Sequence, residues 1–138
     1  MEKTVAESAT EQIQILMPAD INGAGRLFGG KLMEWIDVVA AVVARRHSGH
    51  DVTTACVDTL VFGAPAHANQ TLTLKGRVTY VGRTSIEVRV ETFIEDLDGE
   101  RHSINKAYLV LVAIDEHERP VEVPRLKLLT DEDRTEWE

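Results

Sequence analysis

Five stretches of the chain have the composition or the alternation of β-strands. In the clearest, at 70–81, Leu72 and Leu74 alternate with threonines and a lysine, so that one face is apolar and the other polar. The Asp98-Gly99 pair between the last two stretches is typical of a hairpin turn. These patterns predict strands at 13–17, 52–62, 70–81, 84–95 and about 102–114.

A sixth stretch, from about Gly30 to His47, follows helical periodicity instead. It is apolar around most of its circumference, with these large side chains: Leu32, Met33, Trp35, Ile36, Val38, Val39, Val42 and Val43. A helix that is apolar nearly all round is expected to be buried rather than to lie on a surface. Gly49, behind Arg45 and Arg46, is typical of the residue that ends such a helix.

The order of these elements predicts an α+β fold in which an antiparallel sheet wraps around one long central helix. The sheet has one face to bury, and the helix is the element that covers it. We expect a single domain over residues 1–138, with a core at about 13–125 and a loose, charged lead-in at 1–12. The C-terminal extension at 126–138 is expected to hold a short helix capped by Thr130. Open strand edges favour pairing with a second copy.

Composition narrows the possible functions. The formal net charge of −8 argues against nucleic acid as the main partner, but a local basic pocket could still hold a phosphorylated ligand. No apolar run is long enough to cross a membrane, and the acidic N-terminus does not resemble a signal peptide. The single cysteine, Cys56, is expected in the core and favours a reducing, cytoplasmic setting. The histidines show no metal-ligand spacing, so we expect no metal site.

A glycine-rich loop at 18–30 precedes the helix. Part of this loop fits the pattern of a phosphate-binding loop, but a leucine occupies the position where magnesium binding needs serine or threonine. Strands and helices also do not alternate along the chain, as such a loop requires. Nucleotide hydrolysis is therefore disfavoured. Gly29 and Gly30 could bring unpaired N–H groups of the helix start close to a phosphate or a developing oxyanion. Asn22 could orient a water molecule, or it could simply form a turn with Gly23.

Asp37 lies part-way along the apolar helix. Small neighbours such as Ala40 leave room beside its carboxylate, which makes it a candidate general base or nucleophile. The alternative is structural, because Lys31, Glu34 and Arg45 fall near the same helical stripe and would place it on a solvated face. The pattern alone leaves both interpretations open.

Two further polar groups suit a phosphate. The turn Gly82-Arg83-Thr84-Ser85 places a cation and two hydroxyls between two strands, although ordinary turns also contain such residues. Lys106 lies within an otherwise apolar strand, which requires either a surface face or an anionic ligand.

Three groups of residues follow one another along the chain, and their combination is specific. The first is Pro18-x-Asp20-x-Asn22-x-x-Gly25-x-x-Phe28-Gly29-Gly30, with Leu32-Met33 and Asp37 after it. The second is Tyr80-Val81-Gly82-Arg83-Thr84-Ser85-x-x-Val88, and the third is Asn105-Lys106-Ala107. In these groups the sequence resembles the hotdog-fold acyl-CoA thioesterases, in particular the bacterial branch related to the animal cytosolic (brain-type) acyl-CoA hydrolases. The resemblance spans roughly residues 13–125.

The resemblance implies a dimer, often within a trimer of dimers, with active sites between subunits. Asp37 would activate water or attack the thioester, Asn22 of the other subunit would position the water, and Gly30 beside Gly29 would polarise the carbonyl. The residues implied to contact the substrate and its coenzyme A portion are Phe28, Gly29, Gly82, Arg83, Thr84, Ser85 and Lys106. Such an enzyme of fatty acid metabolism needs neither metal nor cofactor, because coenzyme A is part of its substrate and product.

The same fold can serve other functions. A dehydratase or hydratase would need a histidine as well as an acid at the site, and no histidine precedes Arg46. A non-catalytic acyl-CoA sensor would use the same pocket, but a binder has no need of both Asn22 and Asp37. The predicted function is therefore hydrolysis of acyl-CoA to a free acid and coenzyme A in the cytoplasm.

Overall fold

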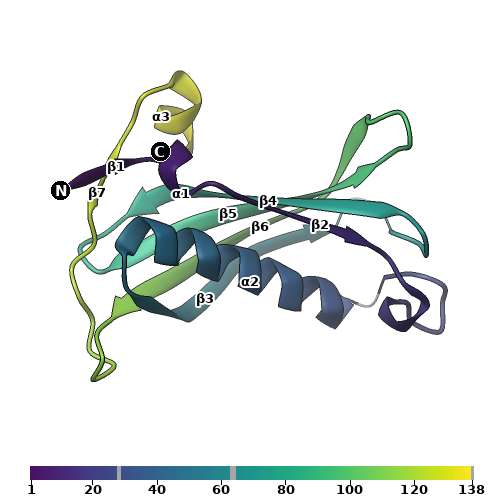
Figure 1. Ribbon diagram of the computed structural model, residues 1–138, viewed down its shortest axis with the longest axis horizontal. Coiled ribbons are helices and arrows are strands. Elements are labelled where there is room, and N and C mark those ends of the chain that lie inside the picture. The colour runs from purple at the N-terminus through teal and green to yellow at the C-terminus, as the bar shows by residue number, and fades with distance from the viewer. Residues whose placement is uncertain (28, 63–64, 138) are drawn as a thin grey trace.

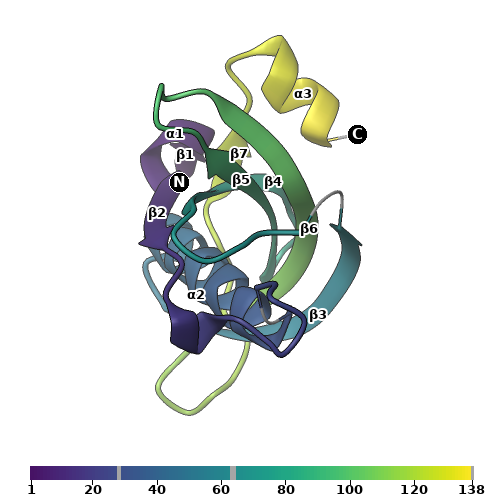
Figure 2. The ribbon, with the colours of Figure 1, turned by 90° about the vertical axis from the view of Figure 1, so that its right-hand side faces the viewer.

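The structure, a computed structural model, describes residues 1–27, 29–62 and 65–137. Its main layer is a curled antiparallel sheet of five strands in the order β2-β4-β5-β6-β3. These strands are β2 (Thr10–Ile15), β3 (Asp51–Phe62), β4 (Thr71–Val81), β5 (Ser85–Glu95) and β6 (Arg101–Ile114). The long helix α2 (Gly29–Ser48) lies in the hollow of the sheet (Figure 1, Figure 2). The predicted α+β fold, with a sheet wrapped around one helix, is confirmed.

Smaller elements accompany the main sheet and α2 in the described part of the chain. The smaller elements are β1 (Glu2–Thr4), α1 (Val5–Ser8), the 3₁₀ helix η1 (Pro18–Asp20), β7 (Arg125–Lys127) and α3 (Asp131–Trp137). β1 and β7 pair in parallel and form a second, two-stranded sheet. No helix in the described part of the chain is long and apolar enough to cross a membrane.

The loose lead-in expected at 1–12 is wrong. Thr4 and Glu7 cap α1 reciprocally, because the side chain of each accepts the backbone N–H of the other. Val5 is buried, and the next strand begins at Thr10 rather than at Ile13. The expected C-terminal cap is confirmed, because the Thr130 hydroxyl accepts the N–H of Asp133 at 3.0 Å.

Helix α2 packs directly on β4 because of one glycine. A Cβ atom at Gly76 would lie 2.8 Å from Cγ1 of Val39 and 2.9 Å from Cγ2 of Val43, closer than carbon atoms can approach. The missing side chain therefore sets the distance between helix and sheet. The inner face of α2 is fully buried there, together with Leu32 and Ile36.

The outer face of α2 is not buried, which corrects the expectation that the helix is covered all round. Asp37 is exposed, and Val38 is 50% exposed. Edge strand β3 beside it is exposed from Thr53 to Val57, including Cys56, which was wrongly expected in the core. The physical reason is that the sheet curls around one side of α2, and no other described element of this chain covers the opposite side.

Candidate active site

The carboxylate of Asp37 is held by a residue of the edge strand. The hydroxyl of Thr54 donates a hydrogen bond to Oδ1 of Asp37, with an Oγ1–Oδ1 distance of 2.7 Å. The register of β3 against β6 shifts immediately after Thr54, and such irregularities redirect side chains. Within the described residues, the second carboxylate oxygen has no partner, so it stays available to a ligand from solvent. The bond orients the acid without burying it.

The sequence patterns did not identify Thr54 as a residue of the site. Its position inside a β-branched stretch is ordinary for a strand, and nothing in the pattern links it to Asp37 on the preceding helix. The contact depends on how far the edge strand extends along the helix, which is a property of the folded sheet.

Asn22 shapes its own loop. Its side-chain Oδ1 accepts the N–H groups of Ala24 at 3.0 Å and of Arg26 at 3.2 Å, and its backbone N–H donates to the carbonyl of Arg26. These donors identify Oδ1, so the amide nitrogen Nδ2 carries the free hydrogens. No described residue accepts them. The turn expected as an alternative is thus present, and it still leaves an outward amide donor.

The loop ends beside the first turn of α2. An open cavity of about 550 Å³ is lined by Ala19, Ile21, Asn22, Gly30, Lys31 and Glu34. The N–H groups of the first helical turn have no acceptor inside the helix, and they carry the positive end of its dipole. The structure therefore brings two of the predicted residues, Asn22 and Gly30, to the same cavity, with helix-start donors available to an anion.

Asp37 does not line that cavity within one chain. It lies two helical turns beyond Gly30, about 10 Å further along the axis of α2. The cavity at the start of the helix and the carboxylate on its side are both open to solvent. A single copy of the chain therefore presents the parts of the predicted site separately.

The residues predicted to contact coenzyme A are also dispersed. The turn 82–85 lies at the end of the sheet nearest the C-terminus of α2, opposite the loop that holds Asn22 (Figure 1). Its Arg83 is exposed, with Glu122 3.9 Å away, and the N–H of Gly82 donates to the carbonyl of Ser85. Phe28 lies outside the described residues.

Lys106 is exposed on β6, opposite Glu91 of β5, so its surface position explains it without a ligand. It lies six positions along β6 from Val112, which pairs with Ser85, a distance of about 20 Å along the strand. In one copy, Lys106 and the 82–85 turn therefore do not form a single site.

One group of potential metal ligands was not anticipated from the spacing. Ligand atoms of Asp96, Glu100 and His102 lie within 4.8 Å of one another, but all three side chains are exposed. His102 Nε2 lies 2.7 Å from the Asp96 carboxylate, and this hydrogen bond raises the pKa of His102. An exposed hydrogen-bonded pair beside a hairpin turn accounts for the group, so it does not point to a metal.

Comparison with known proteins agrees with this architecture. Residues 24–99 match the model of the thioesterase superfamily. An uncharacterized acyl-CoA thioester hydrolase of Bacillus subtilis is 38% identical over 128 residues, which cover 92% of this chain and 74% of that protein.

Solved structures are similar over nearly the whole chain. A crystal structure of an apo-hexameric acyl-CoA thioesterase has a TM-score of 0.95 and 36% identity, covering 99% of this chain and 88% of the other. The acyl-CoA hydrolase of Staphylococcus aureus, in complex with butyryl coenzyme A, coenzyme A and coenzyme A disulfide, has a TM-score of 0.95 and 31% identity, covering 99% and 84%.

Further structures of that staphylococcal enzyme carry alanine in place of an aspartate, an asparagine or a threonine. The matching sheet, helix and sequence lead to one conclusion. The chain belongs to the thioesterase superfamily, among the hotdog-fold acyl-CoA thioester hydrolases.

Proposed function

We propose that this chain hydrolyses acyl-CoA to a free carboxylic acid and coenzyme A, with Asp37 as the catalytic carboxylate. The observation that carries the assignment is the hydrogen bond from Thr54, which orients the exposed carboxylate and leaves its second oxygen open. A thioester is reactive enough that one carboxylate and one oxyanion site suffice. The relatives compared above are described as hydrolases, which favours hydrolysis over a non-catalytic sensor.

In the proposed reaction, Asp37 accepts a proton from a water molecule as the water oxygen attacks the thioester carbonyl carbon. Alternatively, the carboxylate attacks that carbon directly and water then cleaves the resulting anhydride. On either route the carbonyl oxygen becomes an oxyanion, which the N–H of Gly30 stabilises at the start of α2. The intermediate collapses by breaking the carbon–sulfur bond, and the coenzyme A thiolate takes up a proton. No metal or other cofactor takes part in these steps.

The spacing of the altered residues in the staphylococcal enzyme supports the same three side chains. The asparagine, aspartate and threonine replaced in that protein lie 15 and 17 positions apart. The same intervals separate Asn22, Asp37 and Thr54. A shared spacing within chains of matching fold supports a shared site.

We further propose that the complete site forms between two copies of the chain. The exposed residues 53–57 of edge strand β3 and the outer face of α2 are left open, and an open strand edge pairs readily with another strand. Pairing there would bring Asn22 of one copy toward Asp37 of the other. Related thioesterases are hexameric, which supports further assembly as a trimer of dimers.

In that assembly coenzyme A would contact Phe28, Gly29 and the 82–85 turn. Lys106 of a neighbouring copy would bind a phosphate of the same coenzyme A. The whole chain, 1–138, would act as one domain. We place it in the cytoplasm, where acyl-CoA is found and a single cysteine stays reduced.

The test is thiol release from a panel of acyl-CoAs by wild type and Asp37→Asn. We expect the variant to lose about 10²- to 10⁴-fold in kcat, the range for removal of a general base, while coenzyme A binding persists. Asp51→Asn is the matched control, since that carboxylate is exposed at the far end of α2 beside Arg45. Retention of most activity by Asp37→Asn would refute its role. Binding of coenzyme A without release from any acyl-CoA would favour the sensor.

A further inference from the structure

Two arginines lie directly opposite each other on the outer face of the sheet. Arg77 of β4 and Arg89 of β5 are a cross-strand pair in the register of these strands. Their side chains are only 16% and 14% exposed. Like charges placed opposite each other destabilise a sheet, and burial increases that cost. This position therefore requires anionic partners.

Helix α3 provides them. Asp133 forms an ion pair with Arg77, and Glu136 forms one with Arg89. The ring of Trp137, the last residue of the helix, lies against Tyr80, with the ring centroids 4.3 Å apart. The two acids are three residues apart on one helical face, a spacing of about 5–6 Å that matches neighbouring strands.

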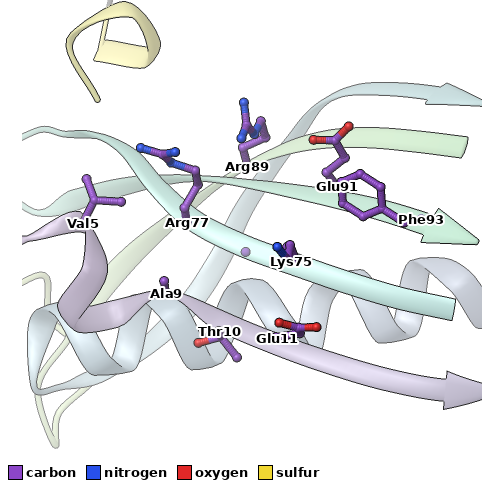
Figure 3. A pocket seen from close by; sticks show the side chains of 10 residues that line it. Val5, Ala9, Thr10, Glu11, Lys75, Arg77, Arg89, Glu91 and Phe93 are labelled. Carbon is purple, nitrogen blue, oxygen red and sulfur yellow. The ribbon is translucent and has the colours of Figure 1, made fainter. Parts of the chain in front are cut away.

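The arginines also border an open cavity of about 530 Å³ on the side away from α2. Figure 3 shows both side chains extending from the strands toward α3, with Lys75 further along β4. Three cations line the cavity against two carboxylates: Glu11 accepts a hydrogen bond from Arg101, and Glu91, which accepts one from the Ser103 hydroxyl, lies opposite Lys75 in the strand register. A small molecule can therefore approach the arginines from the cavity.

We propose that Arg77 and Arg89 form a binding site for a small molecule with two adjacent anionic groups, and that α3 occupies this site in the free chain. Guanidinium groups bind phosphates and carboxylates through paired N–H donors, and two of them side by side select a ligand with two such groups. The site lies on the face of the sheet opposite α2, so the proposal does not depend on the hydrolase activity.

In this arrangement α3 is a displaceable competitor. A seven-residue helix is not stable in isolation, so α3 depends on its contacts with the sheet. A ligand that takes both arginines removes both ion pairs together. The pair Trp137–Tyr80 then separates, which gives displacement an optical signal that hydrolysis does not produce.

The test uses inorganic pyrophosphate as the diphosphate probe and succinate as the dicarboxylate probe. Trp35→Phe leaves Trp137 as the single tryptophan, and its emission is followed during titration, with sodium chloride at matched ionic strength as the blank. We expect a saturable change with at least one probe and none with the salt. Comparing the two probes distinguishes phosphate from carboxylate chemistry.

Binding is then measured by calorimetry in two variants. Asp133→Asn combined with Glu136→Gln removes the competing charges and should tighten binding at least ten-fold. Arg77→Gln combined with Arg89→Gln should abolish binding, whereas Arg45→Gln, an exposed arginine on α2, should leave it unchanged. Circular dichroism verifies that each variant is folded. Failure of both probes to bind, or equal binding by the double arginine variant, would overturn the proposal.

Discussion

At the scale of single residues, the bond from Thr54 to Asp37 restricts how the carboxylate meets a ligand. Asp37 is exposed, and an exposed acid on a helix normally samples several rotamers. Threonine is branched at Cβ and has few rotamers of its own, so its hydroxyl is a well-fixed donor. The pair thereby aligns one oxygen of the acid and leaves the other for reaction.

Replacement of Thr54 tests this alignment. Thr54→Val keeps the shape but removes the donor, and we expect kcat to fall about ten-fold, the equivalent of one hydrogen bond to a charged group. Thr54→Ser restores the hydroxyl and should recover most of the rate. Steady-state kinetics with one acyl-CoA measure both, and an unchanged kcat in Thr54→Val would show that the hydroxyl is dispensable. Thr53→Val, on the same strand, is the control.

His47 makes stability depend on pH. Burial lowers the pKa of this histidine. The hydrogen bond between its Nε2 and the Pro124 carbonyl, 2.7 Å apart, acts in the opposite direction but is the smaller effect. The folded chain therefore binds this proton less readily than the unfolded chain, whose histidine has its ordinary pKa near 6.5. As pH falls below that value, the unfolded state gains protons first, and the free energy of unfolding decreases.

Urea unfolding between pH 7 and pH 5 measures this effect. We expect His47→Gln to lose less stability over this interval than wild type does, whatever its stability at pH 7. His50→Gln, at an exposed histidine nearby, should keep the wild-type slope. Equal slopes in wild type and His47→Gln would contradict the assignment. His102 contributes in the opposite direction in all three proteins, because its raised pKa favours the folded state at low pH.

At the scale of elements, the sequence predicted the fold because its main elements follow clear periodicities. The alternation through Leu72 and Leu74 predicted β4, and the apolar run after Gly30 predicted α2. The prediction that α2 is buried all round was wrong, because an apolar residue such as Val38 does not reveal from the sequence whether it faces a core or an open surface. Thr54 was missed because its role arises only when β3 lies beside α2.

The contact between α2 and β4 depends on the absence of a side chain at Gly76. Gly76→Ala would place a methyl group against Val39 and Val43, and we expect it to lower the free energy of unfolding by about 1–3 kcal/mol through overpacking. Gly23→Ala is the control, because no atom lies within 4 Å of the added carbon. Chemical denaturation compares the two. Equal stability of both variants would mean that helix and sheet can separate without cost.

At the scale of the whole molecule, a site shared between copies can be tested by mixing two defective chains. Asn22→Ala and Asp37→Asn are each expected to be inactive when pure. A mixed pair contains one intact site out of two, so pairs purified through both tags should show about half of the wild-type rate. The chains are co-expressed and purified through two different tags, and thiol release is measured. No recovery in verified mixed pairs would place both residues in one copy.

The open edge of β3 has a consequence for how much enzyme a given amount of chain represents. If a working unit needs two chains, mass action makes the number of working units grow with the square of chain concentration when the chain is scarce. It becomes proportional only once most chains are paired. A modest rise in synthesis would then produce a disproportionate rise in acyl-CoA turnover, so the open edge of β3 would make protein abundance itself a control on the rate.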